Sequence, residues 1–356
     1  MLNPNIGLQL SELDKVRYIK QLILHDIEQE GQQRLKMAKI LFVGAGGLAS
    51  SSILYLVATG IEHIGIVDED EVELSNLQRQ VIHSIQTLGQ LKVESSYKRI
   101  KEINPSCKVY LYPKYLNDSN AHSIIKQYDI VIDASDNIEA RLLIDKVCQN
   151  LNKPYLYAAI SELEGQVSVF NYQKGARYTD IYQSANLNAF NNCHTQGVLS
   201  VLPGIIGLFQ ATEVIKIILG VPTVLNKQLL TYNGFETKWN QLNINSAVIK
   251  CATNRRLVIA DRSQSEIITK QALVRSDRAD FIIDVRTRHE FIEKRSRFYS
   301  NSVNIPMHVL LNDKQLDLIS EEYKTKNIII YCNSQSRGKI AVQLLKRHNI
   351  SAHLAI

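Results

Sequence analysis

The 356-residue sequence lacks long apolar runs, concentrated basic tracts and closely spaced cysteines. Without about 18 consecutive apolar residues, no membrane-spanning segment is expected. Lys and Arg number 41 against 35 Asp and Glu. Because this small excess is spread along the chain, it does not indicate nucleic-acid binding. The first residues lack a charged start followed by an apolar run, so we expect no secretion signal.

Only five cysteines occur, at wide spacings, and they are not typical of a disulfide framework. A reducing compartment is therefore expected. We interpret Cys107, Cys148 and Cys251 as small packing residues. The abundance of Ile, Asn and Lys favours an AT-rich coding genome, such as that of a plastid. Together these features predict a protein of the cytosol or the plastid stroma.

Short apolar runs alternate with segments of helical spacing along the first two thirds of the chain. This alternation predicts an α/β fold: a Rossmann-like, mostly parallel sheet with helices on both faces. The polar segment 174–193 is expected to be a loop, and 228–232 a further strand. The other expected strands are 39–43, 64–68, 108–112 and 129–133, and the expected helices are 13–34, 50–59, 90–103 and 205–219.

A chain of this length corresponds to roughly two and a half domains of about 150 residues each. Because the apolar periodicity weakens after Asn243, we predict one domain over 1–245, a linker over 246–262 and a second domain over 263–356. Apolar strands at 281–285 and 327–332, and a helix at 339–348, predict a small α/β fold for the second domain.

A glycine-rich turn, Gly44-Ala45-Gly46-Gly47, follows the first strand and opens a helix, and Asp68 ends the next strand. Glycines let phosphate approach the backbone N–H groups, and a helix N-terminus favours an anion. The carboxylate of Asp68 is suited to accept hydrogen bonds from ribose hydroxyls. This pattern predicts a nucleotide site, and a nicotinamide-dependent oxidoreductase also fits it.

Charged residues beyond this turn favour a triphosphate ligand. Arg79 and Lys92 would supply cations, and Asp136 would hold Mg²⁺. A dehydrogenase does not need these residues. A carboxylate that attacks a phosphate needs such cations because the two groups repel each other. It needs no general base, since it is already ionised at neutral pH.

The chain resembles the E1-like adenylyltransferases of the HesA/MoeB/ThiF family, most nearly their molybdopterin-synthase branch. The motifs are Gly-Ala-Gly-Gly-Leu, Glu-Leu-Ser-Asn-Leu-Gln-Arg-Gln, Gly-Gln-x-Lys-Val-Glu, Ala-Ser-Asp-Asn, Glu-Gly-Gln-Val and Gly-Val-Leu-Ser-Val-Leu-Pro-Gly. The resemblance implies that a ubiquitin-like sulfur carrier with a Gly-Gly terminus attacks the α-phosphate of ATP, releasing pyrophosphate. It implies contacts to the nucleotide or its Mg²⁺ from Gly44, Gly46, Gly47, Asp68, Asn76, Arg79, Lys92 and Asp136.

Two departures from the family pattern stand out. The family's second Arg in Arg-Tyr-x-Arg-Gln, which reaches the phosphates from the partner subunit, is Lys20 here. Lysine keeps the charge but loses the forked geometry, and we expect a homodimer. The first zinc-binding Cys-x-x-Cys pair of many relatives falls at Tyr178 and Ile181, and the second region offers only Cys251. We therefore expect no zinc.

Two cysteines are candidates for sulfur chemistry. Cys193 matches the position of a reactive cysteine in some relatives, and the alternative is an inert packed thiol. The last 95 or so residues resemble a rhodanese domain, which ends here at Ile356, before the family's final glycine pair and helix. Cys332 and Arg337 keep the spacing of its persulfide loop, while Gln335 replaces a central glycine.

The resemblance leaves several functions open. The expected carrier is the small subunit of molybdopterin synthase, in molybdenum cofactor biosynthesis, with a carrier for thiamine synthesis or tRNA thiolation as the alternative. The rhodanese-like domain would receive sulfur from a donor such as a cysteine desulfurase, or serve only as a platform for a dimer or the carrier. The alternative to an enzyme is a scaffold that binds the carrier without catalysis.

Overall fold

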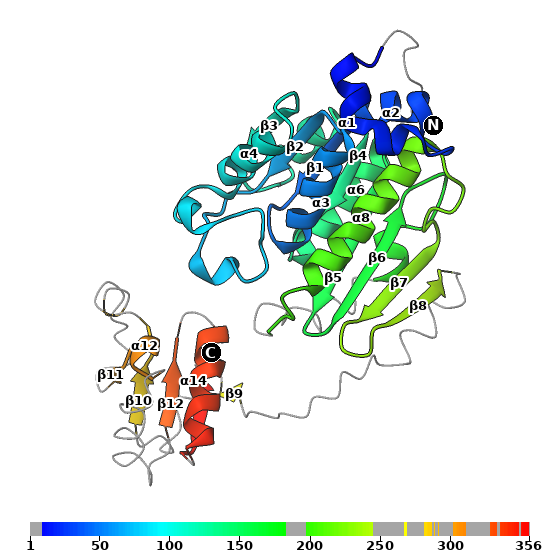
Figure 1. Cartoon of the computed structure of the whole chain (residues 1–356). Coiled ribbons are helices and arrows are strands. Elements are labelled where there is room, and N and C mark those ends of the chain that lie inside the picture. Colours follow the sequence, from blue (N-terminus) through cyan, green and yellow to red (C-terminus); the bar gives the residue numbers. More distant parts are fainter. Residues whose placement is uncertain are drawn as a thin grey trace. The chain divides into compact units, whose positions relative to one another are not determined.

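The computed structural model describes residues 9–182 and 197–244, and from the remainder 267–268, 281–286, 288, 291, 302–310, 328–332, 335–348 and 350–355. The chain divides into two compact units, one of residues 1–193 and 197–255, the other chiefly of residues 256–356 (Figure 1). The predicted division at 245 and 263 lies in residues outside the described ranges and stays a prediction.

An eight-stranded sheet forms the centre of the first unit, in the order β3-β2-β1-β4-β5-β6-β7-β8. Its first five strands are parallel: β3 (Lys108–Tyr112), β2 (His63–Val67), β1 (Lys39–Val43), β4 (Ile130–Asp133) and β5 (Tyr155–Ser161). The last three pair antiparallel: β6 (Glu164–Phe170), β7 (Gln228–Asn233) and β8 (Lys238–Asn243). The predicted Rossmann-like, mostly parallel sheet is confirmed.

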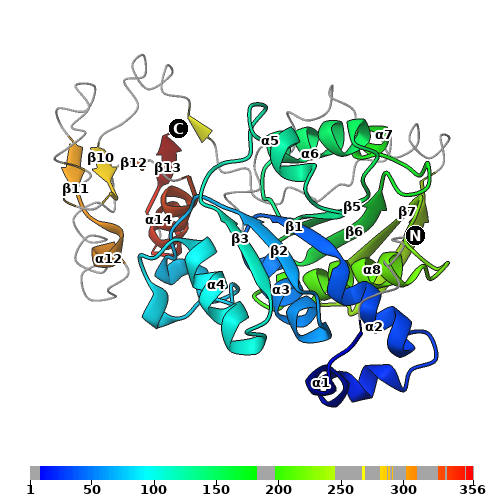
Figure 2. The same cartoon turned by 90° about the horizontal axis from the view of Figure 1, so that it is seen from above.

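Helices cover both faces of this sheet, as the view from above shows (Figure 2). One face carries α3 (Gly47–Thr59), α4 (Lys92–Ile103) and α8 (Leu202–Leu219). The other carries α5 (Ala121–Ile125), α6 (Ile138–Asn150) and α7 (Tyr178–Ile181). Gly60 and Gly220 end α3 and α8 in left-handed conformations, with φ of 108° and 77°, as glycine readily does.

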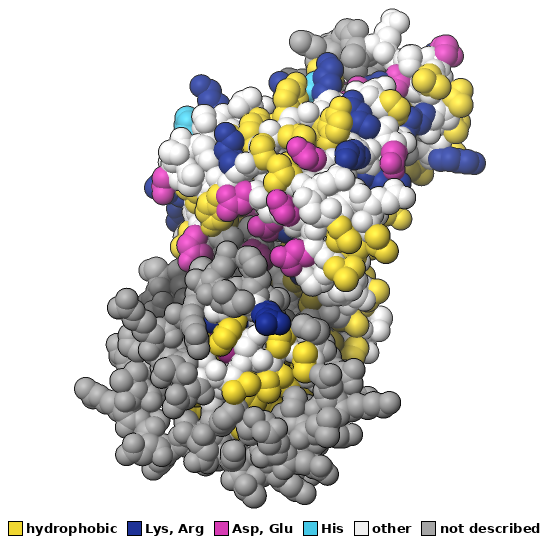
Figure 3. Space-filling model, turned by 90° about the vertical axis from the view of Figure 1, so that its left-hand side faces the viewer, with side chains coloured by type: hydrophobic (Ala, Val, Ile, Leu, Met, Phe, Trp, Pro, Cys, Tyr) yellow, Lys and Arg dark blue, Asp and Glu magenta, His cyan; other side chains and the backbone are white. Residues whose placement is uncertain are grey.

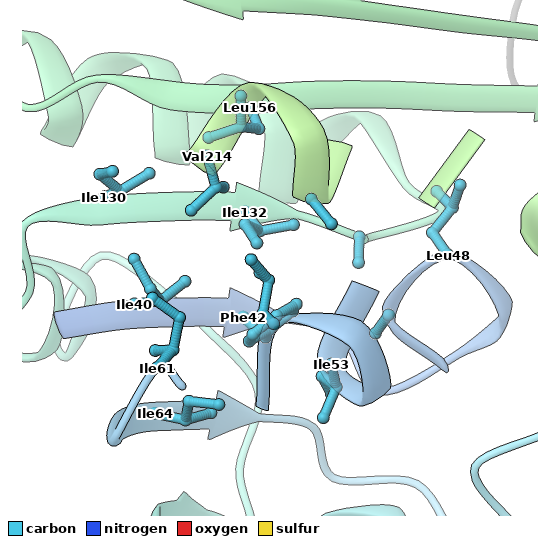
Figure 4. Close-up of a cluster of buried hydrophobic side chains, with 14 of the residues drawn as sticks. Ile40, Phe42, Leu48, Ile53, Ile61, Ile64, Ile130, Ile132, Leu156 and Val214 are labelled. Carbon is cyan, nitrogen blue, oxygen red and sulfur yellow. The ribbon is translucent and has the colours of Figure 1, made fainter. Parts of the chain in front are cut away.

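The two faces have separate hydrophobic cores because alternate residues of each strand point to opposite sides. In β1, Ile40 and Phe42 face α3 and α8, whereas Leu41 and Val43 face α5 and α6. Figure 4 shows the first core, in which Phe42 lies between Ile53 and Val214 from the covering helices. This burial on both faces explains why the parallel strands read as continuous apolar runs.

The predicted single helix over 13–34 is wrong, because two helices occupy this region. They are α1 (Glu12–Leu22) and α2 (Glu28–Met37), with a turn between them. Glu28 has a left-handed φ of 48°, which interrupts a continuous helix. Tyr18 of α1 packs against Gly60, so α1 lies at the C-terminal end of α3.

Helix α8 is long and apolar enough to cross a membrane by length and composition, among the helices described. It packs against α3, β5 and β6, with 56% of its residues buried, and this placement makes it a core helix. Gln210 on α8 donates to the backbone oxygens of Asp133 and Leu156, at 2.8 and 3.2 Å. The helix is therefore tied to the sheet by polar contacts as well as by packing.

The predicted loop over 174–193 is wrong in part, because it contains the one-turn helix α7. Asp145 of α6 is buried, and its carboxylate accepts hydrogen bonds from the backbone N–H of Tyr178 (3.1 Å) and the hydroxyls of Thr179 (2.9 Å) and Tyr155 (2.8 Å). These long-range contacts fix a polar segment whose local sequence indicates no regular structure. Residues 183–193 lie outside the described ranges.

The second unit contains a five-stranded parallel sheet in the order β11-β10-β12-β13-β9. Its described elements are β9 (Ile267–Ile268), β10 (Phe281–Asp284), β11 (Ser302–Asn304), α12 (Met307–Leu310), β12 (Ile328–Tyr331), α14 (Gln335–Arg347) and β13 (Ala352–Ala355). The predicted small α/β fold of this unit is confirmed.

One face of the chain appears in Figure 3, where basic, acidic and apolar side chains stand among one another on the coloured residues. Several exposed apolar side chains belong to α1 and the residues that follow it. They are Leu13, Val16, Ile19, Ile23 and Leu24, each at least 50% exposed. This apolar face bears on the assembly discussed below.

Asp145 offers a test of the anchor for α7. Asp145→Asn replaces one acceptor oxygen by an NH₂ group that faces donors, so the free energy of unfolding should fall by about 1–3 kcal/mol. Asp118→Asn is the matched control, since Asp118 is 82% exposed in its pair with Lys146. Its effect should stay within about 0.5 kcal/mol. Urea unfolding measures the free energy of unfolding of both variants. Equal decreases in the two would contradict the role of Asp145 in fixing α7.

Candidate functional site

The carboxyl ends of β1, β2 and β4 meet at one edge of the sheet, and the loops that follow them touch there. Gly44 follows β1 with φ of 101°, and a Cβ built on it would lie 2.6 Å from the oxygen of Ala134, which follows β4. No other residue type could adopt this conformation at this distance without strain. Gly44 therefore allows the loop after β1 to pack closely against the loop after β4.

Gly46 and Gly47 begin α3, and their surroundings differ. A Cβ on Gly47 would lie 2.9 Å from Pro203, so this glycine allows α3 to approach α8. A Cβ on Gly46 would meet no described atom closer than Gln80 Nε2 at 3.6 Å. Gly46 is thus less crowded than Gly44 or Gly47, and it is only half-buried. No described side chain caps α3, and its first turn holds no acidic residue, which suits an anion.

Asp68, which follows β2, is hydrogen-bonded to the glycine turn. Its Oδ2 accepts a hydrogen bond from the N–H of Ala45 at 2.7 Å, and its Oδ1 accepts one from the N–H of Asp70 at 2.9 Å. Burial raises the pKa of Asp68, while Lys92 and these two N–H donors lower it. Each oxygen has a second lone pair, so contact with a ribose hydroxyl remains compatible with this role.

Lys92 is buried at the start of α4 and pairs with Asp70, a partner that our sequence analysis missed. Its Nζ lies 2.7 Å from Asp70 Oδ2, and its backbone N–H donates to Asp70 O at 2.8 Å. The lysine side chain is 9% exposed and that of Asp70 is 65% exposed. An unpaired buried ammonium is unfavourable, so the Asp70 carboxylate stabilises the charged Lys92. An anionic ligand could then interact with the same ammonium group.

A crossover segment, residues 72–89, carries the next two predicted residues. Bonds from Val72 N–H to Gln90 O and from Gly89 N–H to Val72 O close this segment at its base. Asn76 is buried and accepts a bond from Glu73 N–H through Oδ1. Arg79 passes near Gly47, since its Cγ would lie 3.6 Å from a Cβ there. The segment therefore brings Arg79 to the start of α3.

His83 in the same segment was not among our predicted residues. Its Nε2 lies 3.0 Å from the oxygen of Ala45, and its Nδ1 lies 2.9 Å from Ser95 Oγ on α4. The ring is buried, and burial and the charge of Lys92 lower its pKa. A neutral imidazole has one donor and one acceptor, which matches these two partners.

Two carboxylates follow β4, and their environments differ. Asp133 is fully buried, and its Oδ1 accepts bonds from the N–H and hydroxyl of Ser135 at 3.1 and 2.6 Å. Its Oδ2 has no hydrogen-bond partner among the described atoms, and Arg141 Nε lies 3.9 Å away. Asp136 is exposed on the same loop. Of the two, Asp136 is the one that a hydrated Mg²⁺ ion could reach.

The predicted residues therefore separate into two groups. Gly44, Gly46, Gly47, Asp68, Asn76, Arg79, Lys92 and Asp136 lie on the loops at the carboxyl edge of the sheet, on the crossover segment or at the first residue of α3 or α4. Lys20 lies elsewhere: its neighbour Gln21 donates to Thr59 O, at the opposite end of α3 from the glycine turn. Cys193 and Cys251 lie outside the described residues.

The residues at the expected zinc positions do not fit a metal. Tyr178 is buried among aromatic rings, 5.4 Å from the Tyr157 ring and 4.7 Å from that of Tyr182. Ile181 has no ligand atom, and the described parts of the chain contain no group of three or more His, Cys, Asp or Glu suited to a metal ion. The expected absence of zinc stays a prediction, consistent with this aromatic packing.

Cysteines in the described ranges are buried. Burial raises the pKa of Cys107 to about 12, and it also raises the pKa of Cys148. Both are 0% exposed, so their interpretation as packing residues is confirmed. Cys332 directly follows β12 and precedes α14, and Gly338 passes close to its Cβ, at 3.7 Å from a Cβ built there.

Residues of the second unit's motifs contact one another beside Tyr331, which directly precedes Cys332. Arg286 binds the Asp284 carboxylate through Nε and Nη2, at 3.0 and 2.7 Å, and stacks on Tyr331. Asn304 Nδ2 donates to the backbone oxygens of Asp284 and Arg286, at 3.0 and 2.9 Å. Arg337 lies in the first turn of α14. These contacts join the ends of β10, β11 and β12 at one edge of the second sheet.

Known protein families match the two units of the chain separately. Residues 18–253 match the ThiF family, and residues 269–354 match the rhodanese-like domain. The chain is 41% identical over 352 residues to "Probable molybdopterin-synthase adenylyltransferase" of Gracilaria tenuistipitata var. liui, covering 97% of each chain. It is 33% identical over 364 residues to "Adenylyltransferase and sulfurtransferase MOCS3" of Culex quinquefasciatus, covering 95% of this chain and 83% of the relative.

Solved structures share the fold of the first unit. The crystal structure of E. coli MccB with ATP superposes with a TM-score of 0.58 at 22% identity, covering 67% of this chain and 74% of MccB. SeMet PaaA gives a TM-score of 0.57 at 21% identity, covering 68% and 78%. At these identities the likeness concerns the fold alone. From the sequence matches, the chain belongs to the ThiF family and carries a C-terminal rhodanese-like domain.

Proposed function

We propose that this chain uses ATP to adenylate the C-terminal glycine of a ubiquitin-like sulfur carrier. The observation that carries the proposal is the half-buried start of α3 at Gly46, which no described side chain caps, together with the buried Lys92 at the start of α4 and the exposed Asp136 after β4. Relatives named molybdopterin-synthase adenylyltransferase, 41% and 40% identical to this chain, support the reaction class.

The proposed reaction joins two anions. A carboxylate oxygen of the carrier attacks the α-phosphorus of ATP, a new C–O–P bond forms, and the bond to the β-phosphate breaks to release pyrophosphate. Lys92, Arg79 and the N–H groups of α3 offset the negative charge that builds up in this step. Mg²⁺, held by Asp136, would neutralise phosphate oxygens when bound. No described side chain has to remove a proton, because the attacking group is ionised.

Lys20 enters this scheme from a second copy of the chain. Helix α3 has 13 residues and spans about 20 Å, and Lys20 lies beside its far end. The spacing of Leu13, Val16, Lys20 and Ile23 places Lys20 among exposed apolar side chains on one face of the α1 region. We propose that this face packs in a homodimer and directs Lys20 to the partner's nucleotide.

The carrier that we favour is the small subunit of molybdopterin synthase, because the relatives 39–41% identical to this chain carry that enzyme's name. A carrier for thiamine synthesis or tRNA thiolation would undergo the same chemistry. A scaffold without catalysis would bind the carrier and release no pyrophosphate. Cytosol or plastid stroma remains our prediction for the location of the protein.

Sulfur transfer is the second candidate function, favoured by the position of Cys332 between β12 and α14. A persulfide donor, such as a cysteine desulfurase, would pass its terminal sulfur to the Cys332 thiolate and retain its own sulfur as a thiolate. The N-terminal end of α14, near Arg337, would stabilise the anionic persulfide. Cys193 remains a proposed thiol of this pathway.

Asp136→Asn tests the metal role. It should lower carrier-dependent ATP–pyrophosphate exchange by at least about 100-fold, because a ligand to Mg²⁺ is lost in the step where charge develops. Glu139→Gln removes the same charge from another exposed side chain nearby and should retain exchange within about twofold. Equal exchange in wild type and Asp136→Asn would contradict the metal role.

Mixed dimers test whether Lys20 acts between subunits. Lys20→Ala and Asp136→Asn should each be nearly inactive alone. After subunits are mixed at random, half of the dimers combine both variants and each has one intact site, so about a quarter of wild-type exchange should return. No recovery, in samples shown by native mass spectrometry to contain the mixed dimer, would contradict action in trans.

Cys332→Ser tests sulfur transfer. Incubation with a persulfide donor should add one sulfur atom to the wild-type chain and none at position 332 of the variant, as peptide mass spectrometry would show. Cys107→Ser is the control, because burial raises the pKa of that thiol to about 12 and keeps it protonated. Persulfide found elsewhere, with none on Cys332, would leave the second unit as a platform.

A further inference from the structure

The peptide groups on either side of Ala45, in the middle of the glycine turn, are held from opposite sides. Asp68 Oδ2 accepts from the Ala45 N–H at 2.7 Å, and His83 Nε2 lies 3.0 Å from the Ala45 oxygen. Gly44, Gly46 and Gly47 surround this residue, and glycine has more conformational freedom than any other residue type. Contacts from outside the turn must therefore fix its shape.

The chemistry of the partners defines the state of His83. A backbone oxygen can only accept, so Nε2 carries the hydrogen that it donates to Ala45. Nδ1 then accepts from the Ser95 hydroxyl at 2.9 Å. His83 is 6% exposed and Ser95 is 2% exposed. A neutral ring thus joins the glycine turn to α4, with both of its nitrogens in hydrogen bonds.

His83 also connects the turn to the cationic residues of the site. It lies on the crossover segment that carries Arg79, and Ser95 lies one turn after Lys92 on α4. The side chain therefore bonds the glycine turn to the helix that begins at Lys92, and it stands on the same segment as Arg79. A simple core histidine would not need to bond the peptide that orients a helix start.

We propose that His83 is a positioning residue of the nucleotide site, and this inference rests on the proposed function. By holding the Ala45 oxygen, it orients the peptide group between Ala45 and Gly46, so that the Gly46 N–H, on the opposite side of that group, is directed toward the phosphates. The turn is then already shaped for ATP when the nucleotide arrives, and binding loses less conformational entropy. The residue touches neither substrate nor reacting atoms and acts through Ala45.

Two isosteric substitutions separate its two bonds. His83→Gln places an amide nitrogen near the position of Nε2 and keeps the bond to Ala45. His83→Asn reaches only the position of Nδ1 and keeps the bond to Ser95. Loss of one buried hydrogen bond changes an equilibrium by up to about tenfold. We expect the Kd for Mg-ATP, from equilibrium dialysis without carrier, to rise about tenfold in His83→Asn and less than threefold in His83→Gln.

Ser95→Ala supplies a second, independent comparison. It removes the bond to α4 but leaves the Ala45 bond, so the Tm should fall while the Kd for Mg-ATP changes by less than about threefold. A purely structural role of His83 predicts lower Tm in all three variants with no difference in Kd. That result would overturn the proposal, as would a tenfold loss of ATP affinity in Ser95→Ala.

Exchange kinetics complete the test. In His83→Asn, the KM for ATP should rise about tenfold, while the KM for the carrier stays within about twofold. Equal increases in both values would overturn the proposal. A wild-type chain that binds Mg-ATP but never exchanges pyrophosphate would instead refute the proposed adenylation, and the binding series would still decide the role of His83.

Discussion

The meeting of the carboxyl ends of β1, β2 and β4 at one edge of the sheet is the constraint on which the site depends. Parallel pairing fixes these ends in register, with Val43 beside both Val67 and Asp133. The glycine turn, Asp68 and the loop of Asp136 follow from that register. The cationic residues are held indirectly, because Lys92 opens α4 and Arg79 lies on the crossover segment. A change in the register of any one of these strands would therefore move apart the residues that we propose to bind the nucleotide.

The sequence predicts the fold and the glycine turn because short-range signals specify both. Continuous apolar runs indicate buried parallel strands, and glycines after a strand indicate a turn into a helix. Asp70 and His83 escape such analysis, since their partners, Lys92 and Ala45, lie 22 and 38 residues away. A lone histidine carries no periodic signal. Its role becomes visible only when the turn and α4 are brought together.

Local sequence also fails where long-range contacts override it. The segment with α7 reads as polar loop, yet two hydrogen bonds to Asp145, from Tyr178 and Thr179, give it a fixed shape. The α1–α2 region reads as one helix, yet Glu28 adopts a left-handed conformation. Neither the contact with Asp145 nor the φ angle of Glu28 can be read from the local pattern of apolar and polar residues. The resemblance to a family indicated which loops to expect around the nucleotide but did not predict either feature.

In each unit, a buried aspartate at the end of a parallel strand binds the residues that follow that strand. A buried aspartate ends a central parallel strand in each, Asp133 in β4 and Asp284 in β10, with an arginine nearby. Arg286 binds Asp284 through two nitrogens, whereas Arg141 Nε stays 3.9 Å from Asp133. Burial raises the pKa of Asp133, and Arg141 lowers it. The buried carboxylate bonds the loop, and the exposed Asp136 on that loop is the residue that we propose as the Mg²⁺ ligand. Burial thus separates the structural acid, Asp133, from the proposed metal ligand, Asp136, within four residues at the end of one strand.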